Sequence, residues 1–230
     1  MDRKIVRTRL TTLAATSALL GSGLLWSASP AHATMPGTNG RIACASTRDG
    51  NSQIYTFDPA GTEVQATRIT NNSAFDGRPR YSPDGRKIAF ESNRDGPTEI
   101  YIMDAQVTAP GANAPTDGTN VRRLTFTGTP GHGNSSPTWS PGGDQIAFQS
   151  TRTGQFQVFK INIDGTGETQ LTNEAAESTL PAWSPDGAKI AFSSRRDDPS
   201  ADVYTMNPDG TGVVNLTHSP GEDSWPTWSP

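Results

Sequence analysis

A short apolar segment, Ile-Ala-Phe with Cys in place of Phe in its first copy, occurs four times in this chain. The copies begin at Ile42, Ile88, Ile146 and Ile190, so neighbouring copies lie 46, 58 and 44 residues apart. A period of this length is typical of chains in which one supersecondary unit is repeated and each copy packs on the next. The fold must therefore be built from this repeated unit.

Each unit is expected to form four short strands. The first ends at an aromatic residue and the second is the Ile-Ala-Phe run. The third carries a pair such as Ile100-Tyr101, and the fourth a Leu-Thr or Ile-Thr pair. Ser-Pro-Asp-Gly and Asp-Gly turns separate the strands and account for much of the 23 Gly and 18 Pro. Such a Gly and Pro content excludes a helical bundle.

A period of about 45 residues with four strands per unit predicts an all-β fold, a β-propeller of four-stranded blades. Residues 105–120 are rich in Ala, Pro, Gly and Asn, and we interpret them as a surface loop that lengthens one repeat. The repeats are expected at about 37–78, 79–136, 137–180 and 181–224, with the start of another at 225–230.

Two recurring positions are interpreted as structural. The aromatic residue before each Ser-Pro is expected to pack between blades rather than to stack on a ligand. An arginine four residues after each Phe or Cys is expected to pair with turn carbonyls or an acidic neighbour. The aromatic residues are Tyr81, Trp139, Trp183 and Trp228, and the arginines are Arg48, Arg94, Arg152 and Arg196.

The sequences YSPDGRKIAFESNRDG at 81–96 and WSPDGAKIAFSSRRD at 183–197 resemble the repeat of TolB-type β-propellers, a WD-like family. The likeness covers nearly all of residues 37–230. It implies an exported propeller, and in TolB itself a six-bladed scaffold that binds protein partners at the cell envelope. This sequence has no room for the separate α/β domain that precedes the propeller in TolB. The same repeats also occur beside peptidase domains, so the resemblance implies the architecture more firmly than the function.

The sequence supplies four copies of each of the four strand types in the repeat. However, the first repeat lacks its first strand, and the sequence ends just after an additional first strand, the one that carries Trp228. In one arrangement the last strand completes the first blade and closes a four-bladed ring. In the other, the four blades' worth of strands belong to a larger, six-bladed ring. We favour the second because the chain stops inside a Ser-Pro turn.

Residues 1–33 have the layout of a secretory signal peptide. Arg3, Lys4, Arg7 and Arg9 precede an uncharged stretch, and Ala31-His32-Ala33 offers a cleavage site. A membrane anchor is the alternative, but Thr and Ser residues dilute the stretch. Residues 34–230 would form the propeller, secreted or otherwise extracytoplasmic, and periplasmic where the host has an outer membrane. This part has 15 basic and 22 acidic residues, a net charge of −7, which argues against a nucleic-acid partner.

The sequence carries no recognisable catalytic, cofactor or metal motif. It lacks the Gly-x-Ser-x-Gly elbow of α/β-hydrolases. His132 and His218 lie 86 residues apart, and no Cys/His cluster accompanies them. Cys44 is expected to be a small buried core residue, because Phe takes its place in the other repeats. We therefore expect no enzyme activity and no cofactor.

A partner is expected to bind the loops that lead from each fourth strand to the next first strand. We take five residues on or beside these loops as a candidate channel-mouth face, whose carboxylates would attract a basic peptide or a cation. Ordinary solvated loops are the alternative. The five residues are Asp76, His132, Glu177, Asp223 and Trp225.

The sequence thus predicts a secreted, non-catalytic β-propeller that acts as a scaffold for an unidentified protein or peptide partner. The alternative is the propeller portion of a larger exported peptidase-type enzyme whose catalytic domain lies outside this chain.

Overall fold

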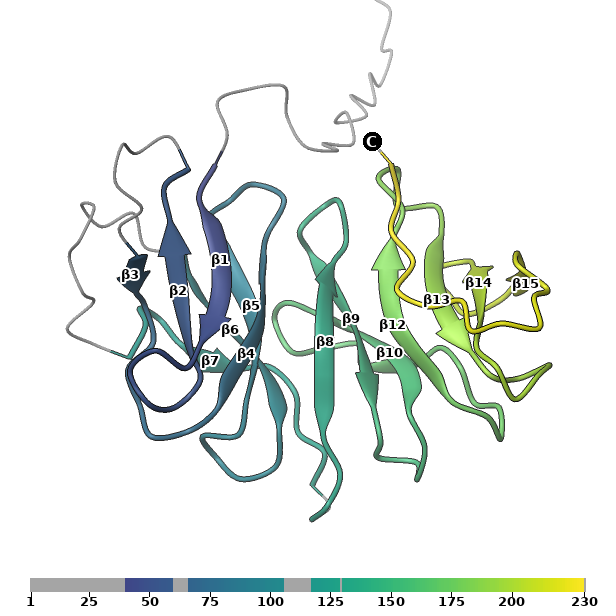
Figure 1. Ribbon diagram of the computed structural model, residues 1–230, viewed down its shortest axis with the longest axis horizontal. Helices are drawn as coiled ribbons and strands as arrows, with labels where there is room; N and C mark the ends of the chain where they lie inside the picture. Colours follow the sequence, from purple (N-terminus) through teal and green to yellow (C-terminus); the bar gives the residue numbers. More distant parts are fainter. Residues whose placement is uncertain (1–39, 60–65, 106–116, 129, 230) are drawn as a thin grey trace, which may run out of the picture. The chain divides into compact units, whose positions relative to one another are not determined.

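The computed structural model describes residues 40–59, 66–105, 117–128 and 130–229. The chain divides into two compact units, Met1–Pro30 and Ala31–Pro230, and all described residues belong to the second. These residues form only β-strands and loops (Figure 1). No helix within the described ranges is long and apolar enough to cross a membrane. The predicted signal peptide at 1–33 and most of the predicted loop at 105–120 lie outside the described residues.

The strands form four antiparallel sheets, which are the blades of a β-propeller and confirm the predicted all-β class. Neighbours in the sequence are neighbours in each sheet, as expected for strands joined by tight turns. Blade 1 contains β1 (Ile42–Ser46), β2 (Gln53–Phe57) and β3 (Ala66–Arg68); blade 2 contains β4 (Asp76–Tyr81), β5 (Lys87–Ser92), β6 (Glu99–Asp104) and β7 (Arg122–Arg123); blade 3 contains β8 (Asn134–Trp139), β9 (Gln145–Ser150), β10 (Gln157–Asn162) and β11 (Thr169–Gln170); blade 4 contains β12 (Ser178–Trp183), β13 (Ile190–Ser194), β14 (Asp202–Met206) and β15 (Val214–Asn215).

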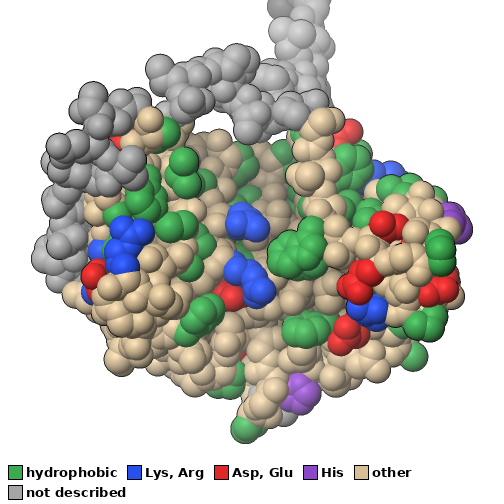
Figure 2. Space-filling model, in the orientation of Figure 1, with side chains coloured by type: hydrophobic (Ala, Val, Ile, Leu, Met, Phe, Trp, Pro, Cys, Tyr) green, Lys and Arg blue, Asp and Glu red, His purple; other side chains and the backbone are tan. Residues whose placement is uncertain are grey.

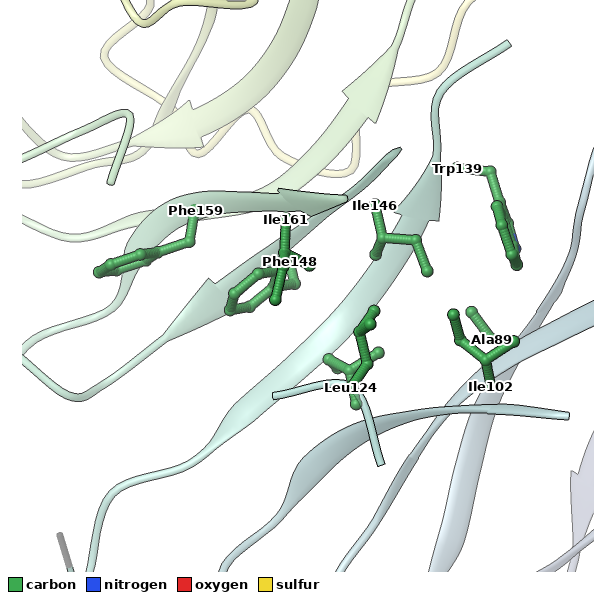
Figure 3. Close-up of a cluster of buried hydrophobic side chains, with 9 residues drawn as sticks. Ala89, Ile102, Leu124, Trp139, Ile146, Phe148, Phe159 and Ile161 are labelled. Carbon is green, nitrogen blue, oxygen red and sulfur yellow. The ribbon is translucent and has the colours of Figure 1, made fainter. Parts of the chain in front are cut away.

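The hydrophobic core lies between neighbouring blades. Figure 3 shows Ala89, Ile102 and Leu124 of blade 2 facing Trp139 and Ile146 of blade 3. The other two core clusters join blade 1 to blade 2 and blade 3 to blade 4 in the same way. Both faces of an inner blade are thus buried, which explains why its second strand is apolar without alternation.

The Ile-Ala-Phe run divides its side chains between these two interfaces. Ile88 and Phe90 pack toward blade 1, whereas Ala89 between them packs toward blade 3. The alternation of β-strand side chains requires this division. Cys44 of blade 1 is only half-buried, so the prediction that Cys44 is a small buried core residue was wrong. Within the described residues, β1 has a strand partner on one side alone.

The segment that follows blade 4 does not complete blade 1. The backbone N–H of Asp223 donates to the carbonyl of Ala201 (2.6 Å), and Trp228 Nε1 donates to the carbonyl of Ala182 (3.0 Å). Both contacts place the segment against blade 4, and the sheet of blade 1 has three strands among the described residues. The four-bladed closure considered from the sequence is therefore not formed in this structure.

The recurring tryptophans connect neighbouring blades. Trp139 Nε1 of blade 3 donates to the carbonyl of Arg80 in blade 2 (2.9 Å), and two repeats later Trp228 makes the same contact with Ala182 of blade 4. Trp183 is half-buried, and its buried indole N–H has no partner among the described residues. Tyr81, at the same position of blade 2, packs against the core between blades 1 and 2.

The recurring arginines lie above aromatic side chains of their own blades. Arg94 lies over the rings of Phe90 and Tyr101, with 5.2 and 5.1 Å from its Cζ to the ring centres. Its Nε donates to Ser92 Oγ (3.0 Å). The same serine bond and ring contacts recur at Arg48, Arg152 and Arg196.

The Ser-Pro-Asp-Gly turns are held by their own side chains. Ser82 Oγ donates to Asp84 Oδ1 (2.6 Å) and accepts the backbone N–H of Lys87 (2.9 Å). Gly85 has a φ of 69°, which explains the glycine that closes the turn. The serine hydroxyl and a backbone N–H bound to each carboxylate lower the pKa of Asp84 and of Asp186, which occupies the same position in blade 4.

These turns predict a loss of stability in acid. A carboxyl whose pKa is lowered by folding stabilises the protein above its ordinary pKa of about 4, and the contribution disappears as the pH falls through the lowered value. We expect the double variant Asp84→Asn, Asp186→Asn to be less stable than the wild type at pH 7, with the gap narrowing below about pH 4. Urea unfolding at several pH values measures this gap, and a gap independent of pH would contradict the assignment.

Candidate functional site

A cavity of about 410 Å³ lies between the first strands of blades 2, 3 and 4 and the segment after blade 4. We call it the hollow. Basic side chains and a large hydrophobic side chain gather over β4, β8 and β12 in the middle of the face shown in Figure 2. The hollow is lined by Arg78, Arg80, Ser136, Pro137, Thr138, Leu180, Pro181, Ala182, Trp183, Pro185, Trp225, Pro226, Thr227 and Trp228.

Each wall of the hollow contains one residue with a positive φ. Arg78, Ser136, Leu180 and Trp225 have φ values of 44°, 54°, 54° and 61°. Each lies directly before a proline and three residues before the recurring aromatic residue. In β4, β8 and β12 the pairing with the second strand shifts at this point, which marks a β-bulge. We call these four the bulge residues.

Residues other than glycine rarely adopt a positive φ, so the surroundings must hold it in place. Glu91 Oε2 of β5 accepts the backbone N–H of Ser136 (3.1 Å), and Gln149 Oε1 of β9 accepts that of Leu180 (2.9 Å). The second strand of one blade therefore holds the bulge of the next. In β13 the corresponding residue is Ser193, whose buried hydroxyl has no partner among the described residues.

The charged side chains that line the hollow are both arginines, whereas Glu177 and Glu222 line the adjoining cavity on the other side of Trp225. The side chain of Arg78 is 45% exposed and forms an ion pair with the buried Glu91 (3.2 Å). Arg80 is exposed, and its Nη1 donates to the carbonyl of Pro79 (3.2 Å). The lining includes these two arginines and no carboxylate. Trp225 adds a large apolar surface, because 65% of this residue is exposed.

The structure separates most of the five residues of the predicted channel-mouth face, although Glu177 and Trp225 line one smaller cavity beside the hollow. Asp76 is a fully buried residue of β4, paired with Arg94 (2.9 Å), so its assignment to an exposed loop was wrong. His132 is half-buried, with Nδ1 against the carbonyl of Thr151. Glu177 is exposed, and Asp223 is half-buried. Only Trp225 of the five lines the hollow.

Sequence reasoning missed the two arginines that line the hollow. The available signal was a residue followed by proline, recurring three positions before the aromatic residue. His132 and His218 do not line the hollow either. The described residues contain no group of three or more His, Cys, Asp or Glu side chains that could hold a metal ion.

The TolB beta propeller domain family matches this chain over residues 27–130 and 119–230. The chain belongs to this family. This match confirms the resemblance to TolB-type propellers that the sequence showed. The Tol-Pal system protein TolB of Desulfosudis oleivorans is 35% identical over 132 residues, which cover 57% of this chain and 26% of that protein. The chain spans well under half the length of the curated relatives it matches.

Solved structures support the same fold. The TolB structure from Acinetobacter baumannii superposes with a TM-score of 0.64 at 27% identity, covering 80% of this chain and 42% of that one. A puromycin hydrolase structure gives a TM-score of 0.63, covering 83% of this chain and 31% of the hydrolase. Its identity is 17%, so this likeness concerns the fold alone.

In this TolB-type propeller, four repeats place different side chains on one backbone geometry. The hollow joins a guanidinium, a hydroxyl, an aliphatic side chain and an indole from the four bulge residues. A site of this composition can bind a side chain or chain segment by hydrogen bonds and apolar contact.

Proposed function

We propose that this propeller is an exported, non-catalytic scaffold that binds a protein or peptide segment in the hollow. One observation carries the proposal. The bulge residues, one from each of four successive repeats, line a single cavity with side chains of different chemistry. An exposed tryptophan beside arginines is the composition that protein interfaces favour at their centres.

Two further points support a partner outside the cytoplasm. The first 33 residues read as a secretory signal. A relative at 35% identity is named as a protein of the Tol-Pal system. The alternative, the propeller portion of a peptidase-type enzyme, rests on a likeness to puromycin hydrolase that reaches only 17% identity.

Trp225 offers a direct test of this proposal. We expect Trp225→Ala to weaken peptide binding about tenfold or more, because an exposed indole in a cavity provides a large contact area. Peptides would be selected from a random phage-displayed library on the 230-residue chain, synthesised with a fluorophore, and measured by fluorescence polarisation.

Phe126→Ala is the matched control. Phe126 is 64% exposed, nearly the same as Trp225, and does not line the hollow. We expect this variant to bind the selected peptides as the wild type does. Peptides that bind both variants and the wild type equally would place the binding surface elsewhere.

A further inference from the structure

We infer that the hollow selects an acidic segment, one that carries a carboxylate next to an apolar or aromatic side chain. The inference deepens the proposed function and rests on it, because it assigns a ligand class to the same hollow. It also reverses the expectation from the sequence, which placed acidic residues at the binding face and a basic partner opposite them.

The charged residues that line the hollow favour an anionic ligand. The chain has 19 Lys and Arg against 23 Asp and Glu, yet the lining of the hollow has two arginines and no carboxylate. Arg80 is exposed, and among the described residues it forms no ion pair. A guanidinium has five N–H donors in a planar fork, which suits a carboxylate with two oxygens. Arg80 therefore retains donors for a ligand.

The apolar side chains that line the hollow favour a ligand with an apolar or aromatic part. The exposed indole of Trp225, the aliphatic side chain of Leu180 and the rings of Pro137, Pro181 and Pro226 provide an apolar wall in the same hollow. A carboxylate alone would gain nothing from this wall. A segment with an apolar or aromatic side chain beside its carboxylate would use both parts.

Glu91 allows a direct test of the anionic ligand, because its carboxylate already pairs with Arg78. Both of its oxygens lie 3.2 Å from Arg78 Nη1, and Oε2 also accepts the N–H of Ser136. Gln149 holds the next bulge through its amide oxygen. Glu91→Gln can therefore keep the bulge in place while it releases Arg78 from its ion pair. The variant would add a second guanidinium for an anionic ligand.

The experiment uses the peptides selected on the 230-residue chain and copies in which every Asp and Glu is replaced by Asn and Gln. We expect the selected peptides to be rich in Asp and Glu and the neutral copies to bind about tenfold more weakly. Arg80→Gln should weaken the acidic peptides about five- to tenfold, and Glu91→Gln should strengthen them about threefold or more. Arg86→Gln is the control, because Arg86 is 85% exposed on a turn outside the hollow and should have no effect.

The outcomes separate the inference from the proposed function. Peptides that depend on Trp225 but are neutral or basic would overturn the acidic ligand and leave the binding role standing. Peptides that do not depend on Trp225 would overturn both. Weaker binding to Glu91→Gln, with circular dichroism and urea unfolding unchanged, would also contradict the inference, because a freed Arg78 should attract a carboxylate.

Discussion

Arg94→Ala is expected to lower the free energy of unfolding by about 3–5 kcal/mol, the range for breaking a buried ion pair by removing one partner. The Arg94 side chain is only 13% exposed, and Nη2 donates to both oxygens of Asp76, which is fully buried (2.9 Å each). Nη1 donates to Asp117 (2.8 Å). The variant would leave Asp76 as a buried carboxylate that, within the described part of the chain, keeps a side-chain hydrogen bond from Asn72 Nδ2 (2.8 Å).

Arg48→Ala is the matched control for this variant. Arg48 has the same place in blade 1 and the same bond to a serine, Ser46, and it lies over Tyr55. It is exposed, however, and among the described residues it forms no ion pair. We expect its replacement to cost about 1 kcal/mol or less. Urea unfolding at pH 7 compares the two, and equal losses would show that Asp76 does not need Arg94.

Glu99→Ala is expected to lower the free energy of unfolding by a similar amount, about 3–5 kcal/mol. The buried carboxylate of Glu99 accepts hydrogen bonds from several residues of the segment that follows β6. Its Oε1 accepts Arg123 Nη2 (2.7 Å) and the backbone N–H of Thr127 (2.7 Å). Its Oε2 accepts Thr125 Oγ1 and Asn134 Nδ2, both at 2.6 Å. Alanine would leave these donors without an acceptor inside the protein.

Glu99→Gln distinguishes the lost hydrogen bonds from the lost charge. Gln53 begins β2 and Gln157 begins β10, as Glu99 begins β6. Each of the two glutamine amides donates to two carbonyls of a following loop. Glutamine therefore suits the backbone there, and we expect a smaller loss of about 1–2 kcal/mol. Thermal and urea unfolding of both variants measure this difference. A glutamine variant as unstable as the alanine variant would show that the charge of Glu99, paired with Arg123, is essential.

The fold could be predicted because the repeat fixes the order of its elements. Ile-Ala-Phe marked β5, β9 and β13 correctly as strands, since a strand buried on both faces must be apolar throughout. The bounds of the first strands were less accurate. Asp76 and Gly77 read as turn residues, yet they pair with β5 across the bulge. The fourth strands end before the Leu-Thr pair, whose side chains are still buried in Leu124 and Thr125.

The hollow was less predictable, for a physical reason. Alternation assigns strand residues to faces, and an extra residue at a bulge breaks that alternation. The recurring proline marks the position of Arg78, but strand alternation does not assign the Arg78 side chain to the cavity. The residue before a proline ordinarily favours extended backbone, so a positive φ there could not be expected. Asp76 was misplaced for the converse reason, because a carboxylate in a presumed loop is normally solvated.

The bulges also allow different side chains to occupy equivalent positions around the hollow. Four residues as different as Arg78, Ser136, Leu180 and Trp225 share one backbone conformation, so this conformation does not depend on the side chain it carries. The core between blades lies on other residues. Each of these four repeats thus provides one position at which the side chain can be replaced without changing the fold. A library randomised at the four bulge residues would vary the ligand preference of the hollow while the scaffold stays constant.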